Sequence, residues 1–228
     1  MGQAVARYLA LWMTYEDAVR VADLKTRASR FERIRASQRQ DAELVVTDFL
    51  KPDLDEIWGV LPHRLVAPFA RWAQRRWPHG RPTLGQHVRT TTITGFLRVR
   101  MLTWLRPLRP MSWRSHEEHG RMARWLAGVS AAAARDEALA CEIAGLAQVI
   151  KGYGDVRRRL LGVFDLALAA SLRAADADVS FAAALASRLR ALVLEGPDGE
   201  SRAEALAAAA GDRLAAEDLP GARALLPA

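Results

Sequence analysis

Thirty of the thirty-three basic residues in this 228-residue chain are arginine, so only Lys25, Lys51 and Lys151 carry an amine side chain. A lysine ammonium is a compact cation on a flexible stem, whereas a guanidinium is a flat fork, and the two differ in what they can reach. Lysine is therefore expected to persist here where arginine cannot replace it, unless the three are chance survivors. If they have a function, they converge on one pocket or interface, and Lys→Arg impairs it.

Lys151 precedes a glycine turn at residues 152–155, and three consecutive arginines follow at 157–159. Two glycines allow positive φ and a close backbone approach, which predicts a rigid corner between two helices. If this corner also binds a ligand, Tyr153 and Arg157 are its binding residues together with Lys151.

Threonines occupy positions 90, 91, 92 and 94, and Gly95 follows them. Consecutive threonines disfavour a helix interior but suit a helix cap or an anion-binding turn. Thr91 is the candidate ligand residue of this segment.

The sequence contains no complete metal-binding motif and no recognisable catalytic nucleophile. His116 and His119 are three residues apart, whereas zinc proteases need a spacing of four. Cys141 is the only cysteine, which excludes an internal disulfide and an iron–sulfur cluster held by this chain alone. It lies in an apolar helical run, which favours a buried side chain. We assign no catalytic and no metal-binding residue.

The composition is that of a globular protein with a formal net charge of +7, which makes nucleic acids, anionic cofactors and acidic proteins candidate partners. No run of 18 uncharged apolar residues and no signal-peptide pattern occurs, so we expect no membrane insertion and a cytoplasmic location.

The hydrophobic pattern predicts a mainly α fold, a multi-helix domain with at most one or two short strands near 44–50 and 88–94. We divide the chain into a helical domain over 1–174 and an Ala-rich helical extension over 175–228, which forms either packing helices or a loosely attached tail. Helices are expected over about 3–13, 15–38, from 53, 62–77, 96–106, 112–133, 136–151 and 155–174.

Arginines alternate with tryptophans near Trp72, Trp104 and Trp125. This pattern could follow a nucleic-acid backbone, with the rings as stacking platforms. At helical spacing, however, we expect the tryptophans to face the core while arginine stems surround them. A basic helical nucleic-acid-binding protein is therefore the alternative function.

Four segments together resemble one family: YEDAVRVADLKTR (15–27), VTDFLKP (46–52), RTTTITGFL (89–97) and VIKGYGD (149–155). Their order and spacing over about residues 5–170 resemble the C-terminal helical domain of the large beta-type subunit of indolepyruvate (2-oxoacid) ferredoxin oxidoreductases. That domain has no assigned chemistry of its own. Each of the three lysines lies inside one of these segments.

The resemblance implies membership of a complex that oxidatively decarboxylates aryl-pyruvates to acyl-CoA thioesters with thiamine diphosphate and iron–sulfur clusters. Two departures stand out. The resemblance begins near residue 5, so the family's N-terminal Rossmann-like gamma-type domain is expected to be absent from this chain, and Val156 stands where threonine is expected. The chain is thus expected to be a piece of a split gene, an excised fragment or a stand-alone relative, with any gamma-type domain on another chain.

On this resemblance we expect a non-catalytic accessory domain, inactive alone, that docks on the thiamine- and cluster-binding large subunit. No cofactor is expected to bind this chain alone. An anionic CoA or phosphate moiety of the complex would meet Lys25, Lys51, Thr91, Lys151, Tyr153 and Arg157.

Overall fold

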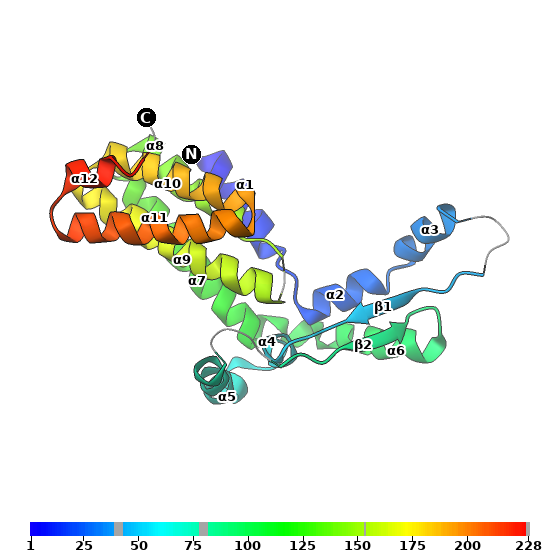
Figure 1. Ribbon diagram of the computed structural model, residues 1–228. Coiled ribbons are helices and arrows are strands. Elements are labelled where there is room, and N and C mark those ends of the chain that lie inside the picture. Colours follow the sequence, from blue (N-terminus) through cyan, green and yellow to red (C-terminus); the bar gives the residue numbers. More distant parts are fainter. Residues whose placement is uncertain (39–42, 78–81, 153, 227–228) are drawn as a thin grey trace. The chain divides into compact units, whose positions relative to one another are not determined.

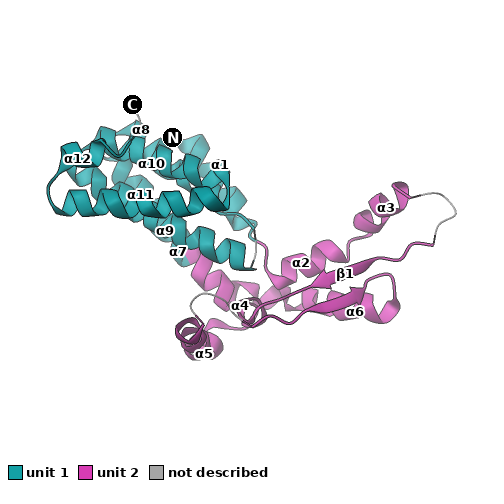
Figure 2. Cartoon of the chain, in the orientation of Figure 1, with its two compact units in different colours: residues 1–15, 120–228 teal, residues 16–119 magenta. Residues whose placement is uncertain are grey.

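The computed structural model describes residues 1–38, 43–77, 82–152 and 154–226, and it confirms the mainly α fold (Figure 1). The chain forms two compact units (Figure 2). Unit 1 comprises residues 1–15 and 120–228, and unit 2 comprises residues 16–119. No helix of the described part of the chain is long and apolar enough to cross a membrane.

Unit 1 is a helical bundle in which α10 packs against α8, α9 and α11, and α1 packs against α8. Its elements are α1 (Gly2–Met13), the part of α7 (Trp113–Ala133) that begins at Gly120, α8 (Glu137–Gly145), the 3-10 helix η2 (Leu146–Val149), α9 (Gly154–Ala177), α10 (Val179–Glu195), α11 (Pro197–Ala215) and α12 (Leu219–Arg223).

A single large core holds unit 1 together. Trp125 and Phe164 are fully buried there, and the Trp125 indole N–H donates to the Ile143 carbonyl oxygen at 3.1 Å. The Trp12 ring lies 5.8 Å from that of Trp125 and meets that of Phe164 edge-on at 5.3 Å. These ring contacts and the buried area make this core the main source of stability in unit 1.

The Ala-rich segment belongs to this core, so its helices pack rather than trail. Leu185 and Leu189 of α10 are fully buried, as is Ala210 of α11. Asp178 accepts a hydrogen bond from the Phe181 amide at 2.6 Å and caps α10. The boundary that we placed at residue 174 falls inside α9.

Unit 2 contains shorter elements around a two-stranded antiparallel sheet in which Asp48 lies opposite Val88. They are α2 (Ala18–Lys25), α3 (Ala28–Ala36), β1 (Thr47–Leu50), α4 (Leu54–Gly59), α5 (His63–Arg76), β2 (Gln86–Arg89), α6 (Ile93–Met101), the 3-10 helix η1 (Leu102–Met111) and the first residues of α7. β1 lies within the region predicted at 44–50, whereas β2 overlaps the region predicted at 88–94 only at residues 88 and 89 and ends before the threonines.

The apolar cores of unit 2 are small. Val66, Ala67 and Ala70 of α5 pack with Trp113 in one of them. Ala22, Val88 and Val99 form the other, between α2, β2 and α6. Because each core buries little apolar area, polar contacts contribute a larger share of the stability of unit 2 than of unit 1.

The single helix expected over 15–38 is wrong, because the chain breaks at Thr26 and Arg27. The Thr26 hydroxyl donates to the Ala22 carbonyl oxygen at 2.8 Å, and the Thr26 amide donates to the Ala22 and Asp23 carbonyl oxygens. These hydrogen bonds end α2. At the other end, Asp17 caps α2 by accepting from the Arg20 amide at 2.7 Å.

The helix predicted over 96–106 is also misplaced. It begins earlier, at Ile93, where Thr92 is the cap, and it ends at Met101. The following residues form a 3-10 helix that includes Pro107 and Pro110. Proline has no amide hydrogen to donate and clashes within an α-helix, so a regular helix cannot continue through them.

Candidate functional site

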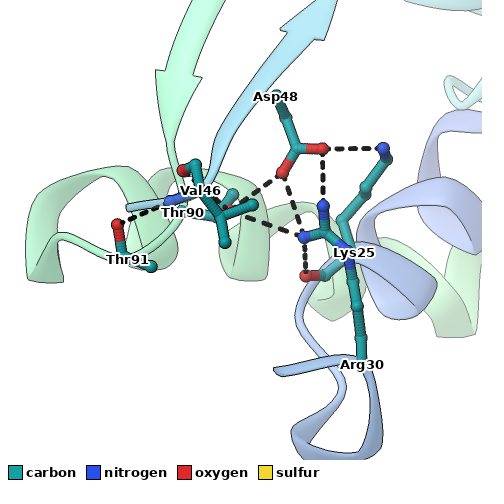
Figure 3. Close-up of polar contacts among 6 residues, drawn as sticks. All are labelled: Lys25, Arg30, Val46, Asp48, Thr90 and Thr91. Atoms are coloured by element: carbon teal, nitrogen blue, oxygen red, sulfur yellow. Dashed lines mark hydrogen bonds and ion pairs between the residues drawn. The ribbon is translucent and has the colours of Figure 1, made fainter. Parts of the chain in front are cut away.

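Asp48 on β1 is the centre of a polar cluster that joins four segments of unit 2 (Figure 3). Lys25, at the end of α2, donates to Asp48 Oδ1 at 2.7 Å. Arg30 of α3 donates to Oδ1 at 2.8 Å and to Oδ2 at 3.0 Å, and also to the Lys25 carbonyl oxygen at 2.8 Å. Thr90, which follows β2, donates to Oδ2 at 2.9 Å. The cluster ties two helices to both strands.

Two cations and one carboxylate make this cluster positive overall. Asp48 is buried, and burial disfavours its charged form. The hydrogen bonds from Lys25, Thr90 and Arg30 outweigh that effect and hold the pKa of Asp48 below its ordinary value. Asp48 is therefore an anion at neutral pH that fixes two cations, an arrangement for positioning charge rather than for transferring protons.

The ion pair with Asp48 gives Lys25 a structural role. Its side chain is 36% exposed, and Asp48 keeps its other donors when Lys25 is replaced. We expect Lys25→Met to lower the free energy of unfolding by about 1 kcal/mol. Chemical denaturation measures this, and Lys51→Met, at an exposed lysine, is the matched control with an expected change within about 0.5 kcal/mol. Equal losses in the two variants would contradict the assignment.

The threonine segment extends the strand pairing and then starts α6. The Thr90 amide donates to the Val46 carbonyl oxygen at 3.0 Å, and Thr91 Oγ1 accepts from the Val46 amide at 3.2 Å. The Thr92 hydroxyl donates to the Arg89 carbonyl oxygen and accepts from the Gly95 amide. Of the two roles considered for this segment, the structure contains the helix cap.

Gly95 is required by this turn. A Cβ atom there would lie 2.0 Å from the Arg89 carbonyl oxygen, a contact that only a backbone shift could relieve. We expect Gly95→Ala to destabilise unit 2 by about 3 kcal/mol, as measured by denaturation. Gly120→Ala in α7, where a Cβ meets nothing within 4 Å, should instead be neutral or stabilising. Similar effects of the two changes would contradict a special role for Gly95.

The other predicted site residues are divided between the units. Lys51 is exposed after β1 in unit 2, near in sequence to Asp48. Lys151 is exposed in unit 1, and Arg157 is buried on α9. Tyr153 lies outside the described residues. The structure brings Lys25 and Thr91 to opposite sides of the segment Val46–Asp48 (Figure 3), and the convergence of all three lysines stays a prediction.

The glycine corner before α9 has the predicted backbone. Gly152 and Gly154 both have positive φ, at 77° and 57°. Asp155 pairs with Arg158 in the first turn of α9. The buried position of Arg157 makes it a poor contact for a surface ligand, unlike Lys151.

The histidines near the start of α7 make local contacts. His116 lies against His63, with ring centroids 3.8 Å apart, and His63 stacks on Trp113. His119 Nδ1 is 2.7 Å from the Ser115 carbonyl oxygen. Among the described residues, no three His, Cys, Asp or Glu side chains are grouped so that they could hold a metal ion.

Large apolar side chains are exposed over much of unit 2. On α5 they are Leu65, Phe69 and Trp72. A second set follows α6 and η1: Ile93, Leu97, Met101, Trp104, Leu108 and Met111. The expectation that the tryptophans face the core is correct for Trp125. It is wrong for Trp72, because α5 buries small or branched side chains on its opposite face, and for Trp104, which lies on η1, an element without a buried residue.

Charge is distributed as unevenly as the exposed apolar area. Residues 16–119 hold the whole net charge of +7, because acidic and basic residues are equal in number elsewhere. Residues 57–116 contain eleven arginines and no Asp, Glu or Lys. This acid-free stretch is the signal that could have located the basic and apolar surface of unit 2 from the sequence, whereas the individual motifs give no sign of it.

A family model described as a family of unknown function (DUF6537) matches residues 1–170. The match spans all of unit 2 and the part of unit 1 up to α9. No curated protein and no solved structure matches the chain.

Proposed function

Since the chain belongs to this family of unknown function, we propose its role from its own surface and from the sequence resemblance: it is a non-catalytic accessory domain of an indolepyruvate-type ferredoxin oxidoreductase. In this role unit 2 docks on the thiamine- and cluster-binding large subunit in the cytoplasm. Unit 1 contributes the larger apolar core of the chain.

The observation that carries the proposal is the exposed apolar area of unit 2. Its internal cores are small, yet Phe69, Trp72 and Trp104 are among the large side chains that it exposes to solvent. Soluble proteins rarely leave such area uncovered unless it binds something. Aromatic residues, Met and Arg are also the types enriched at protein interfaces, whereas Lys, Asp and Glu are depleted there.

The anionic part of the proposal concerns the positive cluster around Asp48. Lys25 and Arg30 are fixed on Asp48, and Lys51 is exposed shortly after the same strand. A CoA or phosphate group of the complex would be attracted by the excess charge of the cluster, and the exposed Lys51 is available to contact it. The thiamine diphosphate and the iron–sulfur clusters belong to the large subunit in this scheme.

Co-expression with the large subunit tests the proposal. We expect the two chains to co-elute in size-exclusion chromatography at a fixed ratio, and aryl-pyruvate-dependent reduction of a ferredoxin to require both. The chain alone should show no such activity. Separate elution at both low and physiological salt, with activity unchanged by the chain, would contradict it.

One observation favours the alternative of a nucleic-acid-binding protein: Trp72 and Trp104 are exposed and each lies close in sequence to arginines. Exposed rings among arginines can stack on single-stranded bases. This alternative predicts that a single-stranded oligonucleotide binds with an affinity that falls steeply with salt. Anisotropy titration that detects no binding at physiological salt would exclude it.

A further inference from the structure

The apolar side chains of α6 and η1 form a stripe along one stretch of chain. Ile93 is 80% exposed and Trp104 is 70% exposed, and the stripe continues to Met111 with one large apolar residue at every third or fourth position. The opposite side of α6 and the start of η1 are anchored by Val99 and Leu102, which pack against Ala22 and Val88. The α6 part of the stripe therefore faces away from this core, and the η1 part contains no buried residue.

Four arginines flank the stripe, and Arg109 alone among them pairs with a carboxylate of the described residues. Arg98 contacts Gln86, and Arg100 donates to Thr26 Oγ1 at 3.4 Å. Arg109 is held by Asp17 at 2.5 Å. Arg106 is exposed and makes no ion pair with any described carboxylate. A face of this kind presents apolar area at its centre and guanidinium groups at its margins.

The chemistry of this face discriminates between partners. A second copy of unit 2 would bring two surfaces of the same positive sign together, which is unfavourable. A nucleic acid could stack on Trp104 but gains nothing from Ile93 or Leu97, which offer no ring. Helices that lie on membrane surfaces are continuous amphipathic α-helices, whereas this stripe passes from the short α6 into a 3-10 helix that contains Pro107 and Pro110. An acidic protein surface matches both features, since Arg pairs carboxylates in a bidentate manner.

We propose that the stripe Ile93–Met111 is the docking surface for a protein whose contacting face is apolar at its centre and acidic at its margins. This inference shares one premise with the proposed function, that unit 2 is an interface. It does not depend on which protein binds. Trp104 fills a pocket of the partner, and Arg106 pairs with a carboxylate at the rim.

Site-specific photo-crosslinking in the cells that make the protein tests this directly. The photo-reactive residue p-benzoylphenylalanine replaces Trp104 in the full chain, and Leu166 of α9, exposed in unit 1, is the matched control position. We expect position 104 to form an adduct with a net-acidic peptide of one protein, and position 166 to form none. Arg106→Glu in the same chain should reduce the adduct about tenfold, while Arg173→Glu in unit 1 leaves it unchanged.

The outcomes separate the two proposals. An adduct with the large subunit supports both. An adduct with an acidic segment of another protein supports the stripe and contradicts the oxidoreductase role. An adduct with lipid, nucleic acid, a basic peptide or a second copy of the chain overturns the stripe proposal, and so does a yield no higher than at position 166. If the large subunit co-elutes with the chain but cross-links only at position 166, the stripe proposal alone fails.

Discussion

Asp48→Ala is expected to lower the stability of unit 2 by about 3–5 kcal/mol, because it leaves partly buried cations without their carboxylate. Arg30 would lose two hydrogen bonds, and Lys25 and Thr90 would lose one each. The small apolar cores of unit 2 offer little to compensate. Hydrogen exchange, read peptide by peptide, should show faster exchange in β1, β2 and α3.

The matched control is Asp176→Ala, which removes an exposed ion pair with Arg135 in unit 1. Surface ion pairs contribute at most about 1 kcal/mol, so this variant should unfold nearly as the natural chain does. If the two variants lose equal stability, or if Asp48→Ala leaves exchange in β1 unchanged, the cluster does not hold unit 2 together.

The Asp48 carboxylate also makes the stability of unit 2 depend on pH in the acid range. Because the folded-state pKa of Asp48 is lower than its ordinary value of 3.8, its contribution is complete above that value and disappears as the pH falls through the folded pKa. When the pH is lowered from about 5 to about 2, the free energy of unfolding should therefore fall less in Asp48→Asn than in the natural chain. Urea denaturation at each pH measures the difference, and parallel curves would contradict it.

Trp125→Ala is expected to destabilise unit 1 by about 3–5 kcal/mol, the usual cost of removing a large ring from a packed core. Its indole is fully buried, contacts Trp12 and donates to the Ile143 carbonyl oxygen. The change leaves a cavity and removes one hydrogen bond from the core. Thermal unfolding of the full chain measures the loss.

Trp104→Ala is the control, since this tryptophan is 70% exposed and its removal should change the stability by no more than about 0.5 kcal/mol. Together the two variants distinguish a tryptophan that stabilises the fold from one that is available for binding. A large loss of stability in Trp104→Ala would mean that its ring is part of the fold, and the docking role of the stripe would then be in doubt.

Local signals predicted much of the fold. The helices expected from residue 53 and over 62–77 are present, with Asp53 as the cap of α4 and Pro62 before α5. The break after Lys25 could not be predicted in this way, because it depends on Thr26 bonding back into its own helix and on distant Asp48 drawing Lys25 and Arg30 together. Such long-range polar contacts leave no periodic pattern.

The candidate site was predicted in part. Lys25 and Thr91 were chosen from composition and local sequence, and both lie beside the segment that carries Asp48. Asp48 itself was not chosen, although a single carboxylate in an apolar β-rich run is typical of a buried ion pair. The exposed stripe was not predicted. Amphipathic spacing indicates that a helix has an apolar face, but it does not indicate whether another element covers that face.

Hydrogen exchange of the chain, alone and mixed with the large subunit, tests the central claim that unit 2 is the interface. We predict slower exchange in residues 93–111 on mixing and no change in α10, which lies in the core of unit 1. Protection confined to unit 1, or an unchanged exchange pattern in unit 2 when the two proteins are mixed at high concentration, would contradict it.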